Sequence, residues 1–415
     1  MKPTVCLVIL LLFLSLHPQS GYTEDLSDFY FDYSSFADSP LFRDPNTGRT
    51  IFPTLLVPMG GKYEGMGTAY TAVADDSGYI EANPAGSSLL AKTELSLHHN
   101  NWIADSSLES AVYTVRDNNL GLGFAGKFLY LPFTAFNEWG DRDSRGYISE
   151  SVLTANISYN FLSSYNFHGI SLGSSVKLGY RNIPSAVYPD QSIFTAMTDI
   201  GALTRFNFLK AYPSRDKNFS LGIAAKNLGL PSDGEPLPSL ASAGLSYSPL
   251  RPLTLALDIN YPFAFSLPSE EWEKAYFAGG MDVRFTDFLS IHSGFTHRGG
   301  NPRFSLGSGL ELEKMKINLN YTLDMTTQLH SADRFSIEAN MDLGDRGRGA
   351  AQERLEEYYT AGLDSYTEGD YERAIKFWEA ALDIDPAFQP ASENIQIAEK
   401  SLSLQRTMRE LEKVE

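Results

Sequence analysis

Two short patterns in the sequence have the glycine spacing of known chemical sites. Residues 121–126 read GLGFAG, the spacing of a dinucleotide-binding loop, whose glycines let a helix N-terminus approach a pyrophosphate. Residues 169–173 read GISLG, the spacing of a nucleophile elbow, which exposes a serine on a strained turn into a helix. Both patterns lie inside runs of alternating polarity that continue past them, so the turn into a helix is missing. We therefore interpret Ser171 as an ordinary strand residue and expect no nucleotide cofactor.

The histidines and paired carboxylates do not form a metal or acid–base set either. Adjacent His98 and His99 point to opposite faces of a strand and cannot bind one ion. The other candidates have no spacing suited to shared ligation or proton transfer: His292, His297, His330, Asp75-Asp76 and Glu270-Glu271. We expect the two carboxylate pairs to be solvated loop charges. The sequence thus predicts no metal, no cofactor and no catalytic residue, and we expect the protein not to be an enzyme.

The amino-acid composition excludes several further classes of protein. The chain has 415 residues, of which 43% are hydrophobic, with 26 Phe and 22 Tyr, too many aromatics for a disordered acidic chain. A net charge of −18 without a Lys/Arg stripe makes nucleic acid an unlikely partner by repulsion from phosphates. The single cysteine, Cys6, lies in the N-terminal apolar segment, which excludes a disulfide framework. Mean hydropathy is only −0.21 despite the aromatics.

The N-terminus has the pattern of a secretory signal. Lys2 precedes an apolar stretch over residues 5–16, and small residues follow at Ser20 and Gly21. The stretch is too short for a membrane-spanning helix, which needs about 20 apolar residues. We expect residues 1–21 to be a cleaved signal peptide, followed by an N-terminal arm over residues 22–51.

Residues 93–343 repeat one pattern, a run with apolar residues at every second position followed by a turn signal. We count about fourteen such runs, including weaker ones near Leu95, Val112 and Ala202. The strands of a water-soluble β-sandwich also alternate between apolar and polar residues, so alternation alone does not distinguish that fold from a transmembrane barrel. Many runs end in Tyr or Phe and have about nine to eleven residues, as strands that cross a membrane do. Short turns near residues 249–251, 286–287 and 313–314 alternate with longer loops over residues 262–274, 297–303 and 324–333. These features favour an all-β transmembrane barrel of about 14 antiparallel strands.

The segments before and after the barrel differ from it in composition. Residues 52–92 are rich in glycine, alanine and turn formers, and we expect them to form a plug, or hatch, inside the lumen. Residues 344–351 have a linker composition, and residues 352–413 have the period of helices, with Pro386 as a stop. We expect a small all-α C-terminal domain there. A disproportionate share of the negative charge lies in this tail.

The plug segment carries a family resemblance. Gly65-Met-Gly67 followed by Asn83-Pro84-Ala85-Gly86, ahead of the strands, resembles the N-terminal region of the FadL-like outer-membrane transporters, in particular their spirochaetal and PorV-type relatives. The resemblance covers residues 52–343. It implies a fourteen-stranded barrel plugged by a hatch, which admits hydrophobic molecules such as long-chain fatty acids or lipids. It places these six hatch residues at the opening turn and in the plug.

The tail resembles a tetratricopeptide repeat. The large, small and helix-ending positions of that repeat are matched by Tyr358, Gly362, Ala374, Trp378, Ala381 and Pro386. One repeat and one further helix are present, whereas about three repeats are normally needed for stability. The resemblance implies docking on the barrel or on another protein.

The sequence leaves more than one function open. The first hypothesis is an outer-membrane FadL-like channel for uptake of hydrophobic ligands, with a periplasmic tail that binds a protein. The alternative is a PorV-type outer-membrane scaffold or shuttle for protein secretion, and a third is a nonspecific porin. Loop aromatics such as Trp139 and Trp272 are candidates for lining a ligand pocket.

Overall fold

The computed structural model describes residues 44–103, 105–136, 139–164, 167–184, 192–213, 217–232, 234–324 and 333–412. The expected signal peptide, most of the N-terminal arm, His330 and most of the 324–333 loop lie outside these residues.

Fourteen antiparallel strands form one closed barrel, in which each strand pairs with its sequence neighbours and β1 pairs with β14. Closure leaves no free sheet edge, so every strand has partners on both sides. The predicted fold class, an all-β barrel with a helical C-terminal region, is confirmed. The strands are β1 (Glu94–Asn101), β2 (Ser107–Asp117), β3 (Leu120–Phe136), β4 (Arg142–Phe161), β5 (Ile170–Asn182), β6 (Ile193–Phe206), β7 (Phe219–Leu228), β8 (Ser239–Leu250), β9 (Leu253–Phe263), β10 (Tyr276–Thr286), β11 (Leu289–Arg298), β12 (Asn301–Glu311), β13 (Met315–Asp324) and β14 (Arg334–Asp342).

The alternation in the sequence sorts the side chains between the two faces of the wall. On β5, Leu172 and Val176 are exposed on the outside, whereas Ser171 and Ser175 are buried in the lumen. The other strands repeat this arrangement, so the exterior is apolar and the interior polar, as a barrel in a bilayer requires. In the parts of the chain that the structure describes, none of the helices is long and apolar enough to span a membrane.

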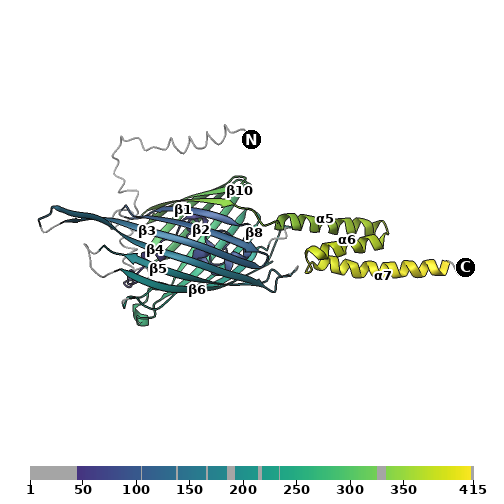
Figure 1. Cartoon of the computed structure of the whole chain (residues 1–415), viewed down its shortest axis with the longest axis horizontal. Coiled ribbons are helices and arrows are strands. Elements are labelled where there is room, and N and C mark those ends of the chain that lie inside the picture. The colour runs from purple at the N-terminus through teal and green to yellow at the C-terminus, as the bar shows by residue number, and fades with distance from the viewer. Residues whose placement is uncertain are drawn as a thin grey trace, which may run out of the picture.

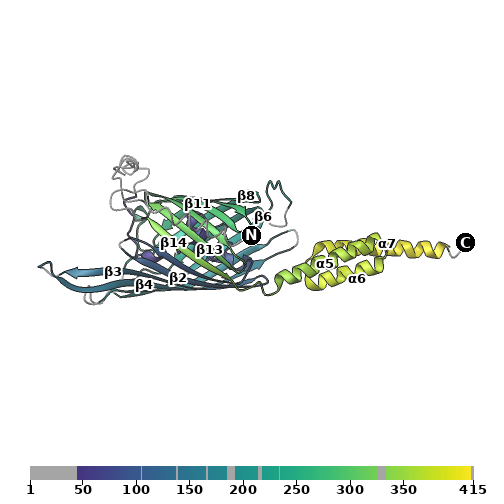
Figure 2. The same cartoon turned by 90° about the horizontal axis from the view of Figure 1, so that it is seen from above.

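The two ends of the barrel differ (Figures 1 and 2). The C-terminal helices leave from one end, called here the tail end, and the β3–β4 hairpin projects from the other. Residues 131–136 and 142–148 pair only with each other, because the pairing of β2 with β3 stops at Tyr130 and that of β4 with β5 starts at Ser149. This two-stranded projection is called the ribbon.

One expected loop is wrong. The long loop predicted over residues 297–303 is a tight turn, because β11 continues to Arg298 and β12 begins at Asn301. Gly299 and Gly300 form this turn with φ of 67° and 74°, values that glycine adopts without a side-chain clash.

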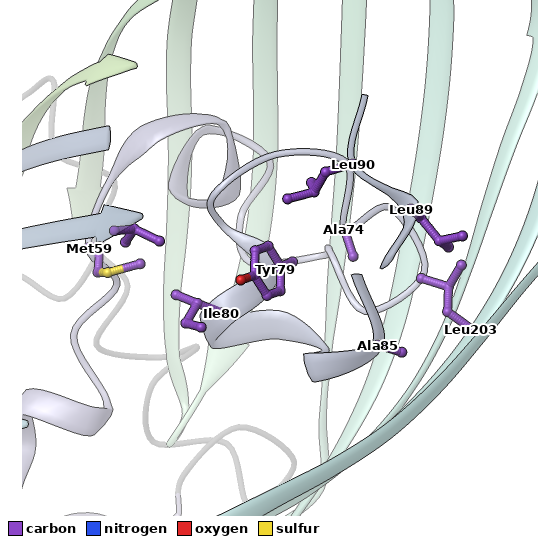
Figure 3. Packing of buried hydrophobic residues seen from close by; sticks show 9 residues of the cluster. Met59, Ala74, Tyr79, Ile80, Ala85, Leu89, Leu90 and Leu203 are labelled. Carbon is purple, nitrogen blue, oxygen red and sulfur yellow. The ribbon is translucent and has the colours of Figure 1, made fainter. Parts of the chain in front are cut away.

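The plug consists of short helices inside the barrel, η2 (Pro53–Leu55), α3 (Gly61–Gly65), α4 (Tyr79–Ala82) and η3 (Pro84–Leu89). In one cluster of their core, Tyr79, Ile80 and Leu90 pack together and meet Val112 and Leu203 of the wall (Figure 3), and Met66, Tyr70 and Val73 form a second cluster. The hatch therefore has an apolar centre of its own and is surrounded by the polar inner face of the strands.

The tail contains α5 (Arg348–Thr367), α6 (Tyr371–Ile384) and α7 (Gln389–Glu412). Trp378 is the centre of its core: its ring packs on Gly362, and its indole N–H donates to the Tyr359 carbonyl at 3.1 Å. Ala374 and Ala381 are fully buried, and α6 ends two residues before Pro386. Tyr358 is 38% exposed instead of filling a large core position, because the adjacent Tyr359 packs against Phe388.

Replacing Trp378 by alanine should unfold the tail selectively. Large-to-small substitutions of buried Trp cost about 3–5 kcal/mol, partly through the cavity they leave. We expect Trp378→Ala to lower the thermal transition of the helical circular dichroism signal of the full-length protein in detergent. Tyr358→Ala, at a half-exposed position, is the control and should shift it little. An unchanged helical transition in Trp378→Ala would contradict this packing.

Candidate functional site: the plugged lumen

Glycines on the inner face of the wall let the hatch backbone lie directly against the strands. A Cβ on Gly294 of β11 would lie 2.0 Å from the Gly67 nitrogen, and one on Gly173 of β5 would lie 2.2 Å from the Pro84 carbonyl. A Cβ on Gly121 of β3 would likewise meet the backbone of Ser87. The glycines that imitate a dinucleotide loop and a nucleophile elbow thus include contact points for the hatch.

The Asn-Pro-Ala-Gly segment is fixed to both hatch and wall. The Asn83 amide donates to the carbonyls of Thr71 at 2.9 Å and Ala202 of β6 at 3.1 Å, while its carbonyl oxygen accepts from the Ala85 N–H and caps η3. The Ser171 hydroxyl donates to the Ala85 carbonyl at 2.6 Å. Gly86 packs on Tyr79, where a Cβ would lie 2.5 Å from that side chain. Ser171 is therefore a wall residue that holds the hatch.

The other two predicted hatch residues lie at the opposite side of the plug. Gly65 ends α3, with Asn320 and His292 of the wall within contact distance of a Cβ placed there. Gly67 has φ of 63°, a left-handed conformation that favours glycine, and it faces Gly294. The structure brings all six predicted hatch residues into the hatch–wall interface or the hatch core, while the predicted helical-repeat residues lie in the separate tail.

Buried charges also join the hatch to the wall, and sequence reasoning missed them. Glu64 of α3 accepts from Arg334 of β14 at 2.8 Å, from Asn100 of β1 at 2.9 Å and from Thr322 of β13 at 3.1 Å. Asp258 of β9 accepts from the N–H groups of Tyr70 and Thr71, both at 2.9 Å. The buried charges of the wall could have been predicted from the sequence, because they occupy inward-facing positions of strands that otherwise carry few charges.

The expectation that Asp75-Asp76 are solvated loop charges is wrong for Asp76. Lys62 of α3 forms ion pairs with Asp75 at 2.9 Å and with Asp282 of β10 at 3.3 Å, and the latter also contacts His292 at 2.8 Å. Asp76 is buried, and its carboxylate accepts from the Gly78 N–H. Asp76 is therefore not a solvated loop charge, because the hatch folds around it within the lumen, whereas the Asp75 side chain is 43% exposed while it pairs with Lys62.

A cavity of about 90 Å³ lies between the hatch and the wall, in the half of the barrel nearer the ribbon. On the hatch side it is lined by apolar residues that include Leu55, Leu56, Val57, Met59 and Ile80. On the wall side it is lined by six cations, Lys127, Lys177, Lys226, Arg298, Arg303 and Arg334. The cavity thus combines an apolar face with a face that carries six cations, and Glu81 of the hatch also lines it.

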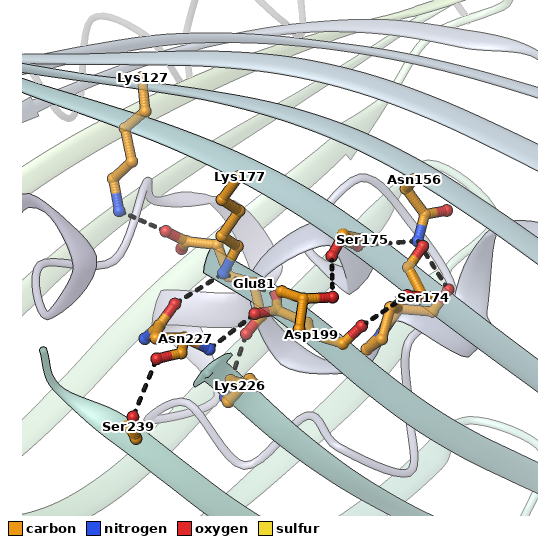
Figure 4. A network of polar contacts seen from close by, with 12 residues as sticks. Glu81, Lys127, Asn156, Ser174, Ser175, Lys177, Asp199, Lys226, Asn227 and Ser239 are labelled. Carbon is orange, nitrogen blue, oxygen red and sulfur yellow. Dashed lines mark hydrogen bonds and ion pairs between the residues drawn. The ribbon is translucent and has the colours of Figure 1, made fainter. Parts of the chain in front are cut away.

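Five of these cations have carboxylate partners. Lys127 pairs with Glu81, Lys177 with Asp199, Arg298 with Glu273, Arg303 with Asp324 and Arg334 with Glu64. Within the described part of the chain, Lys226 has no ion-pair partner. It is buried, and its ammonium donates to the Glu81 carbonyl at 3.0 Å (Figure 4). Lys226 is therefore the cation of this wall whose charge is not compensated by a paired carboxylate.

Other sequence candidates lie away from the cavity. The Trp272 indole donates to the carbonyls of Ala264 and Leu267 and so holds its own loop, and Trp139 is 86% exposed at the tip of the ribbon. His98 is buried in the lumen whereas His99 points outward to Glu109. Over the described ranges, no group of three or more His, Cys, Asp or Glu side chains is arranged to hold a metal ion.

Fold and lumen together define a plugged fourteen-stranded barrel of the kind found in outer-membrane channels. The chain belongs to the uncharacterised protein family UPF0164, whose model matches residues 33–345. Two similar proteins are UPF0164 proteins of Treponema pallidum (strain Nichols). One is 28% identical over 86% of this chain and 84% of its own length, and the other is 26% identical over 84% and 74%.

One solved barrel shares this fold at low identity. A monoaromatic hydrocarbon channel, CymD, has a TM-score of 0.50 at 13% identity and covers 70% of this chain and 98% of its own. The Ralstonia pickettii toluene transporter TbuX has a TM-score of 0.49 at 12% identity, with 69% of this chain and 99% of its own covered.

Adding a side chain where hatch and wall touch should displace the hatch. Gly294→Val places methyl groups where the Gly67 backbone lies, whereas Gly279→Val on the neighbouring strand meets nothing within 4 Å of its Cβ. We expect Gly294→Val to make the hatch segment 60–70 sensitive to limited proteolysis in detergent and Gly279→Val to leave it resistant. Equal resistance in both variants would contradict the close approach.

Removing the Glu64 charge should destabilise the plugged state. Glu64→Gln leaves the buried Arg334 guanidinium uncompensated, which costs about 3–5 kcal/mol. The matched control is Glu271→Gln, whose pair with Arg49 is solvent-exposed and is worth about 1 kcal/mol or less. We expect the free energy of unfolding in urea, measured in lipid vesicles, to be lower for Glu64→Gln than for Glu271→Gln. Equal values would show that the buried Glu64–Arg334 pair does not stabilise the plugged state.

Proposed function

We propose that this protein is an outer-membrane channel of the FadL-like type, which takes up hydrophobic ligands such as long-chain fatty acids or lipids. The observation that carries the proposal is the cavity, which lies inside a barrel with an apolar exterior and has one apolar and one cationic face. Outer-membrane location is supported by the closed sheet and its fold similarity to hydrocarbon channels. The proposal assigns no catalytic residue.

The residues that line the cavity suit an amphiphile with one negative charge better than a neutral hydrocarbon, once the hatch moves and the cavity widens. Burial of an apolar chain against Leu55, Leu56 and Met59 contributes about 25 cal/mol per Å². Because Lys226 has no paired carboxylate, an anionic head group beside it would compensate a buried charge. A fatty acid supplies both parts.

Passage requires the hatch to move. The cavity of about 90 Å³ is smaller than the roughly 300–1,000 Å³ of ordinary ligand pockets, so the structure describes a closed state. Displacement of a lid-like segment is a common way to admit and release a ligand. The polar hatch–wall contacts suit this, since water can replace them when the hatch shifts.

We place the tail in the periplasm. Four of the six strand connections at the tail end are short, since β2–β3, β8–β9, β10–β11 and β12–β13 are joined by residues 118–119, 251–252, 287–288 and 312–314; β4–β5 and β6–β7 are joined by residues 162–169 and 207–218. Longer connections over residues 183–192, 229–238 and 264–275 lie at the ribbon end. Short periplasmic turns and long external loops are the rule in outer-membrane barrels, so the ribbon end would face outward.

Replacing Lys226 should change ligand selectivity. We expect Lys226→Met to weaken binding of a long-chain fatty acid at least about tenfold, because a charge-assisted hydrogen bond to the head group is lost. Binding of a neutral alkane of the same length should stay within about twofold. Displacement of a fluorescent fatty acid from detergent-solubilised protein measures both.

The matched control is Lys314→Met, which removes an exposed lysine in the tail-end turn between β12 and β13. It should leave both affinities unchanged. If Lys226→Met weakens the binding of neither ligand, Lys226 does not bind the head group. If the wild-type protein binds no hydrophobic ligand at all, the channel proposal is wrong.

The tail supports a second candidate, a PorV-type scaffold or shuttle for protein secretion. Ile397, Leu404 and Met408 lie on one face of α7 and are 50%, 66% and 63% exposed, a surface suited to a protein partner. The scaffold predicts that secretion components copurify with the full-length protein and are lost in the double variant Leu404→Glu, Met408→Glu. Their absence from the wild-type preparation would leave the channel as the sole function.

A further inference from the structure

The hatch and the tail meet at the tail end of the barrel. Thr93, which leaves the hatch, donates its N–H to the Gly344 carbonyl at 2.8 Å, and its own carbonyl accepts from the Leu343 N–H at 2.9 Å. Lys92 pairs with Asp342 at 2.7 Å. The exit of the hatch and the start of the tail are therefore joined side by side, although more than 240 residues separate them.

Arg348, the first residue of α5, reaches back into the hatch exit. Its Nη2 donates to the Ala91 carbonyl at 2.6 Å and contacts the Leu90 carbonyl at 3.4 Å. Arg116 of β2 donates to the same Leu90 carbonyl at 3.1 Å. The Leu90 side chain is fully buried in the hatch core, against Tyr79 and Ile80 (Figure 3). Arg348 thus holds the backbone of a residue that anchors the plug.

The segment between β14 and α5 is a defined turn and not an open spacer. The Asp345 carboxylate accepts from the N–H groups of Gly347 at 2.9 Å and Gly349 at 2.6 Å, and its carbonyl accepts from Arg348 Nε at 3.0 Å. Hydrogen bonds from these two glycine N–H groups lower the pKa of Asp345, so the carboxylate that shapes the turn stays ionised at neutral pH. These hydrogen bonds set the direction in which α5 leaves the hatch exit in this state.

We propose that the helical tail is a latch for the hatch, in which Arg348 holds the Leu90–Ala91 backbone in the closed position and displacement of α5 releases it. The proposal rests on the channel function above, because a latch matters where the hatch must move. The geometry suits a lever: α5 has 20 residues and is about 30 Å long, and its contact with the hatch exit is made by its first residue. The helices extend away from the barrel (Figure 2), so a movement of their far end would act on the few hydrogen bonds that Arg348 makes.

Hydrogen–deuterium exchange of the full-length protein in lipid nanodiscs tests the latch without a ligand. We expect Arg348→Ala to speed exchange of residues 84–92 at least about tenfold, because a charge-assisted hydrogen bond to the hatch backbone is lost. A truncation after Leu343, which removes the tail, should do the same. The matched control is Arg354→Ala, since Arg354 of the same helix donates only to the Ala350 carbonyl of its own turn; it should leave the exchange unchanged.

Uptake of a long-chain fatty acid into vesicles that contain each variant tests the consequence. Faster uptake in Arg348→Ala and in the truncation, with no change in Arg354→Ala, supports the latch. Unchanged exchange of residues 84–92 in a correctly folded Arg348→Ala barrel overturns it, as does faster exchange without faster uptake. If the wild-type protein takes up no fatty acid, the channel function fails, and the exchange rates still decide whether the tail holds the hatch.

Discussion

The pairing of β1 with β14 is the constraint on which the rest of the structure depends. It joins Glu94 to Asp342 and Asn101 to Phe335 and so closes the sheet. A closed sheet satisfies every strand without an exposed edge, which allows half of each strand to face lipid and half to be polar. Closure with fourteen strands also sets the diameter of the barrel, and a lumen of that diameter is too wide for the side chains of the wall to fill. The hatch follows from this, because a lumen of this size stays open unless another part of the chain occupies it.

Polar and backbone contacts hold most of the hatch against the wall, and contacts of this kind allow the hatch to be displaced. Its apolar centre around Tyr79 and Leu90 keeps it folded as a unit, while Glu64, Asn83 and Asp258 connect it to the strands. Glycines such as Gly294 and Gly173 bring the two backbones together without interlocking side chains. Closure of the barrel also places the end of β14 beside the start of β1, so the tail begins next to the hatch exit and contacts it through Arg348.

The fold could be predicted from the sequence because its signal is local. Alternation with period two, as in the row from Leu172 to Tyr180, needs no knowledge of distant residues, and the motif around Asn83 is contiguous. The 297–303 loop was wrong because Gly299-Gly300 allows a two-residue turn where a longer loop was expected. The prediction for Asp76 was wrong because its burial depends on how the hatch folds inside the lumen.

The candidate site was much less predictable. Lys226 is distinguished from Lys127 and Lys177 only by the lack of a paired carboxylate, a property that depends on how four strands and the hatch meet. The contact of Arg348 with Ala91 joins residues 257 positions apart, and no spacing in the sequence indicates it. Tyr358 and Tyr359 are adjacent, and only the packing of α5 on α6 and α7 decides which of them packs against the tail core.

The central claim is that the lumen holds a hydrophobic ligand with one anionic group. Mass spectrometry of the small molecules that copurify with the protein from its native membrane tests this claim most directly. The account predicts a stoichiometric amphiphile with a single negative charge, released on denaturation and reduced in the Lys226→Met variant. Recovery of an empty protein, or of a neutral hydrocarbon retained equally by both, would contradict it.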